Sequence, residues 1–324
     1  MSSKSNNQGR AFEYACLKAL HKEISKVRPV SIKQNSSYDA TKKAWDTLSK
    51  TQQATYKISA LAGISPILEL EPLLTERKED EMVLSIQSDE KGIKGDVRDI
   101  LIMRREIDWE IGLSIKHNHA AVKHSRLSKS LDFGKSWYGK ECSEEYWNDV
   151  EPIFDFLEKE KNKRTKWSEL EEKEDMIYLP LLKAFKKEVK KQSAKYPNEV
   201  PRLMSEYLLG VGDQDYYKVI AKRSSKISRV ETYNVKGTLN KQLSNQDKSK
   251  GLPVSQLPTQ FLGLEHKENS KNTLELYMDG GWQFSLRIHN ASTTVEPSLK
   301  FDINLINMPS SIITIERSWK KPEK

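Results

Sequence analysis

The sequence predicts an α/β protein: a mixed β-sheet flanked by helices, with a helical insertion and a β-rich C-terminal region. Two apolar runs, 97–103 and 109–116, flank a charged segment of about five residues, which is typical of an antiparallel hairpin. Helical periodicity dominates before this hairpin, and from Tyr216 the apolar residues recur with a period of two. The expected regions are 1–140 (the core), 141–212 (the helical insertion) and 213–324 (a β-rich recognition region).

Composition narrows the class of protein. The 324 residues carry 54 Lys and Arg against 46 Asp and Glu, a net charge of +8, which favours a polyanionic partner. Cys16 and Cys142 are the only cysteines, so a disulfide framework is excluded. No apolar run approaches 18 residues and the N-terminus is polar, so we expect a cytoplasmic protein without a membrane span.

The first expected helix covers residues 8–28, where apolar side chains recur at helical spacing. Glu13 projects from its early turns and is either an ordinary solvated charge or a functional acid. Further elements before the hairpin are helices over 38–49, 52–61 and 66–74, the last beginning at Pro66, and a strand over 82–87.

The hairpin brings an acid and a lysine together. A loop centred near Ile107 places Asp99 opposite Ser114, with Lys116 one step further, beside Asp96. Carboxylates can hold Mg²⁺, and a neighbouring ammonium can stabilise phosphate charge or orient an attacking water. This polar end of the hairpin is therefore a candidate site for phosphodiester hydrolysis, and the alternative is an ordinary cross-strand ion pair.

The second acid of such a site stays open between Asp96 and Glu13. Glu110 is excluded because it lies roughly 13 Å along the strand from Ser114. Asp96 and Asp99 are three residues apart, so an ideal strand would turn them to opposite faces. Asp96 can join the site only if a bulge or a late start of regular pairing intervenes.

The segment after Lys116 is polar and rich in histidine. We expect it to contact phosphates and base edges beside the hairpin, although a polar surface connector would have the same composition. The candidate DNA-binding residues here are His117, Asn118, His119, Lys123, His124 and Arg126.

The remaining chain is predicted in two blocks. Helices are expected over 143–163 (kinked or split by Pro152), 175–195 and 198–209. Strands are expected over 216–222, 228–235, 261–267, 273–279, 282–289, 299–306 and 311–317. Such strands could read a DNA groove through Arg223, Arg229 and Arg287, or form a plain β-sandwich-like region, and the sequence does not separate the two.

Longer runs carry a family resemblance. Asp99 followed by Ser114-Ile115-Lys116 resembles the PD-(D/E)XK nuclease core, with Ser114 where an acid is usual. The runs GRAFEYACL (9–17), KGDVRDILI (94–102), EIGLSIKHNHAAVKHSRLS (110–128) and LDFGKSWYG (131–139) resemble the HaeIII family of type II restriction endonucleases. Asp132, in the last run, is a weaker candidate for the acid absent at position 114.

The resemblance implies a Mg²⁺-dependent endonuclease that cuts double-stranded DNA at GGCC, with a cognate methyltransferase acting on the same site. It assigns Asp99, Ser114 and Lys116 to the catalytic hairpin and Glu13 to a helix acid. Together with Asp96, which the hairpin geometry suggests, Asp99 and Glu13 are the possible metal ligands. A twofold-symmetric site suits a homodimer. The alternative function is a non-catalytic, sequence-specific DNA-binding protein in which the hairpin acids are structural.

Overall fold

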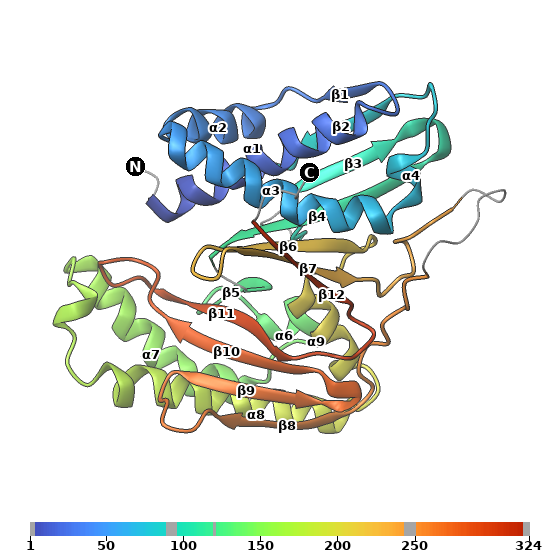
Figure 1. Ribbon diagram of the computed structural model, residues 1–324. Helices are drawn as coiled ribbons and strands as arrows, with labels where there is room; N and C mark the ends of the chain where they lie inside the picture. Colours follow the sequence, from blue (N-terminus) through green and yellow to red (C-terminus); the bar gives the residue numbers. More distant parts are fainter. Residues whose placement is uncertain (1–3, 89–95, 119–120, 243–250, 320–324) are drawn as a thin grey trace. The chain divides into compact units, whose positions relative to one another are not determined.

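The computed structural model describes residues 4–88, 96–118, 121–242 and 251–319, and their chain path is drawn in Figure 1. The chain forms two compact units. The first combines Met1–Ala120, Val211–Ser255 and Ser310–Lys324, and the second combines Ala121–Gly210 and Gln256–Pro309. Each unit contains one β-sheet.

The first unit has a seven-stranded mixed sheet in the order β1-β2-β3-β4-β6-β7-β12. Its strands are β1 (Val30–Ile32), β2 (Met82–Ile86), β3 (Ile100–Arg104), β4 (Trp109–His117), β6 (Tyr216–Lys222), β7 (Ile227–Tyr233) and β12 (Thr314–Ser318). Its helices are α1 (Lys4–Ile24), α2 (Ser36–Asp46), α3 (Lys50–Leu70) and α4 (Pro72–Thr75), and a 3₁₀ turn, Arg105–Ile107, closes the hairpin. Two neighbour pairs, β1–β2 and β4–β6, are parallel.

Helices α1 and α3 lie along one face of this sheet (Figure 1). The core beneath them contains Phe12 and Leu20 of α1, Ile64 of α3, and Leu113 and Val219 of the sheet, all fully buried. The apolar positions of β4 therefore face the helices, and the alternating polar positions face the other way. This arrangement confirms the predicted α/β class with a mixed sheet flanked by helices.

Helix α3 differs from the prediction, because it runs through Pro66 instead of ending before it. Proline removes one backbone donor from a helix, but Ile64, Ile67 and Leu70 continue the buried face across it. Tertiary packing thus outweighs the local cost of the proline. The helix ends at Leu70 with Glu71 as its C-cap, and Pro72 then begins the short helix α4.

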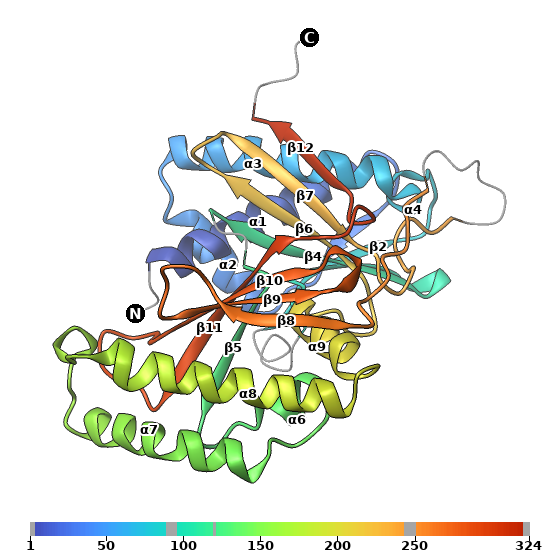
Figure 2. The same cartoon turned by 90° about the horizontal axis from the view of Figure 1, so that it is seen from below.

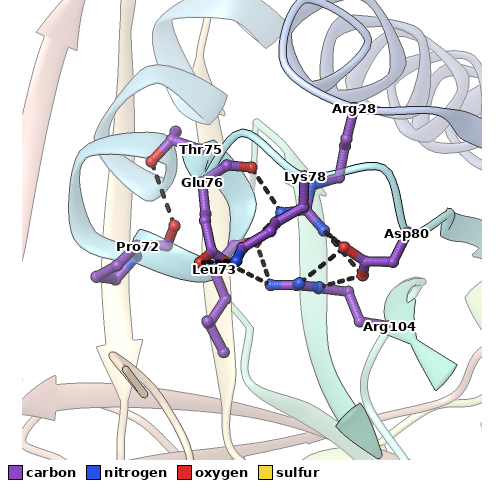
Figure 3. Close-up of polar contacts among 8 residues, drawn as sticks. All are labelled: Arg28, Pro72, Leu73, Thr75, Glu76, Lys78, Asp80 and Arg104. Carbon is purple, nitrogen blue, oxygen red and sulfur yellow. Dashed lines mark hydrogen bonds and ion pairs between the residues drawn. The ribbon is translucent and has the colours of Figure 1, made fainter. Parts of the chain in front are cut away.

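A buried ion cluster joins α4, the loop that follows it and β3 (Figure 3). Asp80 accepts hydrogen bonds from Arg104 Nε at 2.8 Å and from Arg28 Nη1 at 3.1 Å. The Arg28 and Arg104 side chains are almost fully buried, and Glu76 completes the cluster at 3.0 Å from Arg104 Nη1. Burial alone would raise the pKa of Asp80, but the hydrogen bonds from Arg104 lower it below its ordinary value.

The second unit has an antiparallel sheet in the order β5-β11-β10-β9-β8. Its strands are β5 (Lys123–Ser128), β8 (Phe261–His266), β9 (Thr273–Met278), β10 (Gln283–His289) and β11 (Ser298–Asn307). Its helices are α6 (Phe133–Tyr138), α7 (Glu144–Asn162), α8 (Leu179–Lys195) and α9 (Val200–Leu209), with short turns at Trp167–Glu169, Glu174–Tyr178 and Asp279–Gly281. Figure 2 shows α7 and α8 running side by side, and α7 stays continuous through Pro152.

The pairing of strands differs from the three consecutive regions expected from the sequence. Strands β6, β7 and β12, expected in the C-terminal region, complete the first sheet. Strand β5, expected as part of the N-terminal core, pairs instead with β11 in the second sheet. Strands β5, β6 and β12 pair with strands that are distant in the sequence, and local patterning carries no information about those partners.

A buried glutamate makes the stability of the first unit pH-dependent. Glu71 is fully buried and accepts hydrogen bonds from Tyr217 Oη at 2.6 Å and Asn240 N at 2.7 Å. Its Oε2 atom is also buried and has no partner within the described part of the chain. Burial therefore raises the pKa of Glu71 to about 7, in spite of those two hydrogen bonds.

A raised carboxyl pKa means that the folded state binds the proton more tightly than the unfolded chain. Glu71 therefore stabilises the fold most at acidic pH, and we expect this contribution to fall by about 3 kcal/mol as the pH rises from about 4.5 through 7. Glu71→Gln, which carries no titrating proton, should lose that dependence. Chemical denaturation of both proteins at pH 5 and pH 8 measures the difference, and an equal difference at both pH values would contradict this origin.

Candidate active site

The central hairpin has the register that the sequence predicts. Ile100 of β3 pairs with Leu113 of β4, and Arg104 pairs with Trp109 across the loop. Regular pairing begins at Ile100, and Asp99 just before it donates its backbone N–H to Leu113 O at 2.7 Å. This late start satisfies the condition under which Asp96 and Asp99 can lie at the same end of the hairpin.

Asp99 and Lys116 are in contact. Lys116 Nζ lies 3.3 Å from Asp99 Oδ2, and the same oxygen accepts the backbone N–H of Ile115 at 2.5 Å. Both side chains are partly exposed, with about a fifth of each accessible (17% for Lys116 and 26% for Asp99). The backbone fixes the carboxylate, so an acid and an ammonium are held together where a phosphate could approach them.

Glu13 lies on α1, one helical turn before the buried Cys16. Burial raises the pKa of the Cys16 thiol well above its ordinary value, and the negative charges of Glu13 and Asp99 raise it further. Both carboxylates therefore act electrostatically on the same sulfur atom.

Asp96 is held by an arginine that the sequence analysis did not single out. Arg98 donates from Nε to Asp96 Oδ1 at 2.9 Å and from Nη2 to Asp96 Oδ2 at 2.8 Å, while its Nη1 meets Glu110 at 2.7 Å. A Cβ atom at Gly112 would lie only 2.0 Å from Arg98 Cδ, so glycine leaves the room in which the arginine crosses β4. Burial favours the neutral acid, but Arg98 lowers the pKa of Asp96.

A second lysine lies beside the hairpin. Lys218 of β6 pairs in register with Ser114 of β4 and with Glu231 of β7. Burial lowers the pKa of Lys218 to about 8, with Glu231 opposing that shift and Lys116 adding to it. The sequence could not single out Lys218, because its nearness to Ser114 depends on parallel pairing between strands about a hundred residues apart.

The residues after Lys116 are placed unlike the expectation. The His117 ring is buried between Phe12 and Tyr56, with ring centroids 5.7 and 4.9 Å away, and burial lowers its pKa. A buried, neutral imidazole is poorly placed to contact phosphate or base edges. Asn118 has a left-handed backbone conformation (φ 62°). Its side-chain Oδ1 accepts the backbone N–H of Arg223, and this hydrogen bond stabilises the turn after β6. His119 lies outside the described residues.

Four further candidate contacts belong to the second unit, and two of them contact Asp302. His124 Nδ1 and Arg287 Nη2 lie 2.9 and 2.8 Å from the two Asp302 oxygens. The hydrogen bond from His124 is the largest of the effects that lower the pKa of Asp302 far below its ordinary value. Arg126 pairs with Glu296 at 3.2 Å, and Lys123 Nζ lies 3.7 Å from the centre of the Tyr207 ring. Strands β5 and β10 therefore carry basic side chains in the sheet of the second unit.

Three further candidates have clear structural settings. Arg223 is exposed in the turn after β6, whereas Arg229 of β7 is partly buried and pairs with Glu316 at 2.8 Å. Asp132 caps α6 by accepting the N–H of Lys135 at 2.9 Å. This capping role gives Asp132 a structural function in the second unit.

The fold and the hairpin together define a class of protein. An α/β sheet that holds a carboxylate and a lysine at the open end of its central hairpin is the arrangement expected of a nuclease. The model of the HaeIII restriction endonuclease family matches residues 9–309, and the chain belongs to that family.

The relative Type II restriction enzyme HaeIII, from Haemophilus aegyptius, is 48% identical over 321 residues, which cover 99% of this chain and 100% of that protein. No solved structure gives a significant match. The family makes this chain a site-specific deoxyribonuclease. Within the described residues, no helix is both long and apolar enough to cross a membrane.

Proposed function

We propose that this protein is a type II restriction endonuclease that cuts double-stranded DNA at GGCC with Mg²⁺. The observation that carries the proposal is the contact between Asp99 and Lys116, which the backbone of β4 holds at the open end of the hairpin. The cutting site GGCC rests on the resemblance to the HaeIII family. The residues match the requirements of a PD-(D/E)XK-like nuclease core except at Ser114, where a hydroxyl replaces the usual acid.

The described residues of the hairpin site offer Mg²⁺ few protein ligands. The described residues hold no group of three or more His, Cys, Asp or Glu side chains placed to bind a metal. Mg²⁺ nevertheless binds through one or two carboxylates, while waters and substrate phosphates complete its shell. Asp99 would supply the first carboxylate, and Glu13 is favoured as the second because Arg98 already engages both oxygens of Asp96. The bound ion would polarise the scissile phosphate.

The protein side chains then have defined tasks. Lys116, anchored beside Asp99, positions the attacking water and offsets charge that develops on the phosphate. Attack in line with the leaving oxygen releases a 5′-phosphate. The basic side chains of β5 and β10 (Lys123, His124, Arg126, Arg287), with Arg223 and Arg229, are proposed to contact DNA backbone or bases. A homodimer that acts in the cytoplasm, one subunit per strand, would suit the palindrome, and a cognate methyltransferase would protect the same site.

Digestion of a DNA of known sequence, with Mg²⁺ and with EDTA, tests this function. We expect every cut to fall within GGCC, every new end to carry a 5′-phosphate, and cleavage to require the metal. Prior methylation of GGCC should protect the DNA. Tight binding without strand breaks in Mg²⁺ would instead support the alternative, a non-catalytic DNA-binding protein.

A further inference from the structure

A row of polar side chains crosses the sheet at the level of the hairpin site. Ser114 pairs with Lys218, and Lys218 pairs with Glu231, so these side chains share one face of β4, β6 and β7. This is the face that bears Lys116, because side chains two residues apart in a strand point the same way. Asp99 meets the same strand through Ile115 N. The row of polar side chains therefore runs from the proposed active site on β4 across β6 to β7.

Glu231 of β7, on the side of Lys218 away from β4, holds the lysine side chain in place. Lys218 Nζ lies 3.8 Å from Glu231 Oε2, and only 3% of the lysine side chain is exposed. Tyr233 Oη donates to the same Glu231 oxygen at 2.9 Å, and Arg229 approaches the other at 3.8 Å. The carboxylate that pairs with Lys218 is thus itself held, and Lys218 stays in its register position opposite Ser114.

Burying a lysine is costly, and an apolar residue would fill the same space with less loss of hydration. The lysine lies beside position 114, where nuclease cores of this type usually carry an acid. An acid there would stand with Asp99 as a second carboxylate and favour a second divalent ion. This chain has a hydroxyl and an ammonium in place of that negative charge.

We propose that Lys218 supplies, beside Ser114, the positive charge that a second metal ion would otherwise supply, so that each active site works with one divalent ion. This inference rests on the proposed function, because it assigns a role within the same site. Lys218 acts on the neighbouring site through its charge and touches neither substrate nor metal, since its own side chain is buried.

The test uses Lys218→Met/Glu231→Gln, which keeps the volume of the row and leaves no unpaired buried carboxylate. We expect normal folding and DNA affinity in Ca²⁺ within about twofold of the native protein, but cleavage slowed by about a hundredfold. Lys222→Met, on the same strand and outside the row, is the matched control and should cleave normally. If the row is only structural, the double variant will cleave within threefold of the native protein, which overturns the proposal.

Metal counting gives a second readout that does not depend on turnover. Electron paramagnetic resonance of Mn²⁺ bound to the protein–DNA complex should show one ion per subunit for the native protein. Ser114→Asp/Lys218→Met should take up two, because an acid replaces the cation. Two ions in the native complex would overturn the inference. Failure of the proposed function itself is distinguishable, because the native protein would then bind DNA in Mg²⁺ without cutting it.

Discussion

Asp99→Asn is expected to slow DNA cleavage by about a thousandfold or more and to leave folding and DNA binding nearly unchanged. Asparagine has the size of aspartate, and its side-chain oxygen can still accept the N–H of Ile115. It lacks the negative charge that would hold a divalent cation and that pairs with Lys116. The loss should therefore fall on the chemical step, with the affinity for cognate DNA in Ca²⁺ kept.

Asp108→Asn is the matched control for this variant. Asp108 ends the turn of the same hairpin in a left-handed conformation (φ 47°), which asparagine adopts readily. It should cleave at the native rate. Single-turnover cleavage of a duplex with one GGCC site measures both variants, and an Asp99→Asn protein that keeps a tenth of the native rate would remove Asp99 from the proposed mechanism.

Asp80→Asn is expected to lower the free energy of unfolding by about 3–5 kcal/mol, because it breaks a buried ion cluster from one side only. Arg28 and Arg104, both nearly inaccessible, would keep their charges while losing the carboxylate that faces them (Figure 3). The pKa of Asp80 is lowered in the folded state, so its contribution is present above the ordinary carboxyl pKa and is lost as the pH falls through the folded value.

Urea denaturation at neutral pH measures this loss. Lys78→Ala is the matched control, because Lys78 Nζ lies 3.6 Å from Glu76 in the same cluster but half of its side chain is exposed. Its removal should cost less than about 1 kcal/mol. Equal stabilities of the two variants would show that the cluster at Asp80 contributes no more than a surface ion pair.

Local patterning was sufficient to predict the hairpin. Loop length and period-two alternation set the register, and the register alone brought Asp99 to Ser114 and Lys116. Strand β6 was also placed correctly, at Tyr216–Lys222, from its own residues. These features depend on interactions between residues close in the sequence, so they can be predicted from the amino-acid sequence alone.

Long-range packing explains what local patterning missed. The ring of His117 looks like an exposed ligand in the sequence, but Phe12 and Tyr56, from two helices, cover it. Lys218 gains its place beside Ser114 only because β4 and β6 pair in parallel across the whole helical insertion. The role of Arg98 was missed for a similar reason, because its side chain can cross β4 only in the space left at Gly112.

The most direct test of the central claim is a crystal structure of the complex with GGCC-containing DNA and Mn²⁺, with the metal located by its anomalous scattering. The proposed mechanism predicts a Mn²⁺ ion bound to a carboxylate oxygen of Asp99 and to the scissile phosphate, with Lys116 Nζ within hydrogen-bonding distance of that phosphate or of the water poised to attack it. A metal bound elsewhere, with Asp99 and Lys116 remote from the cut phosphate, would contradict it.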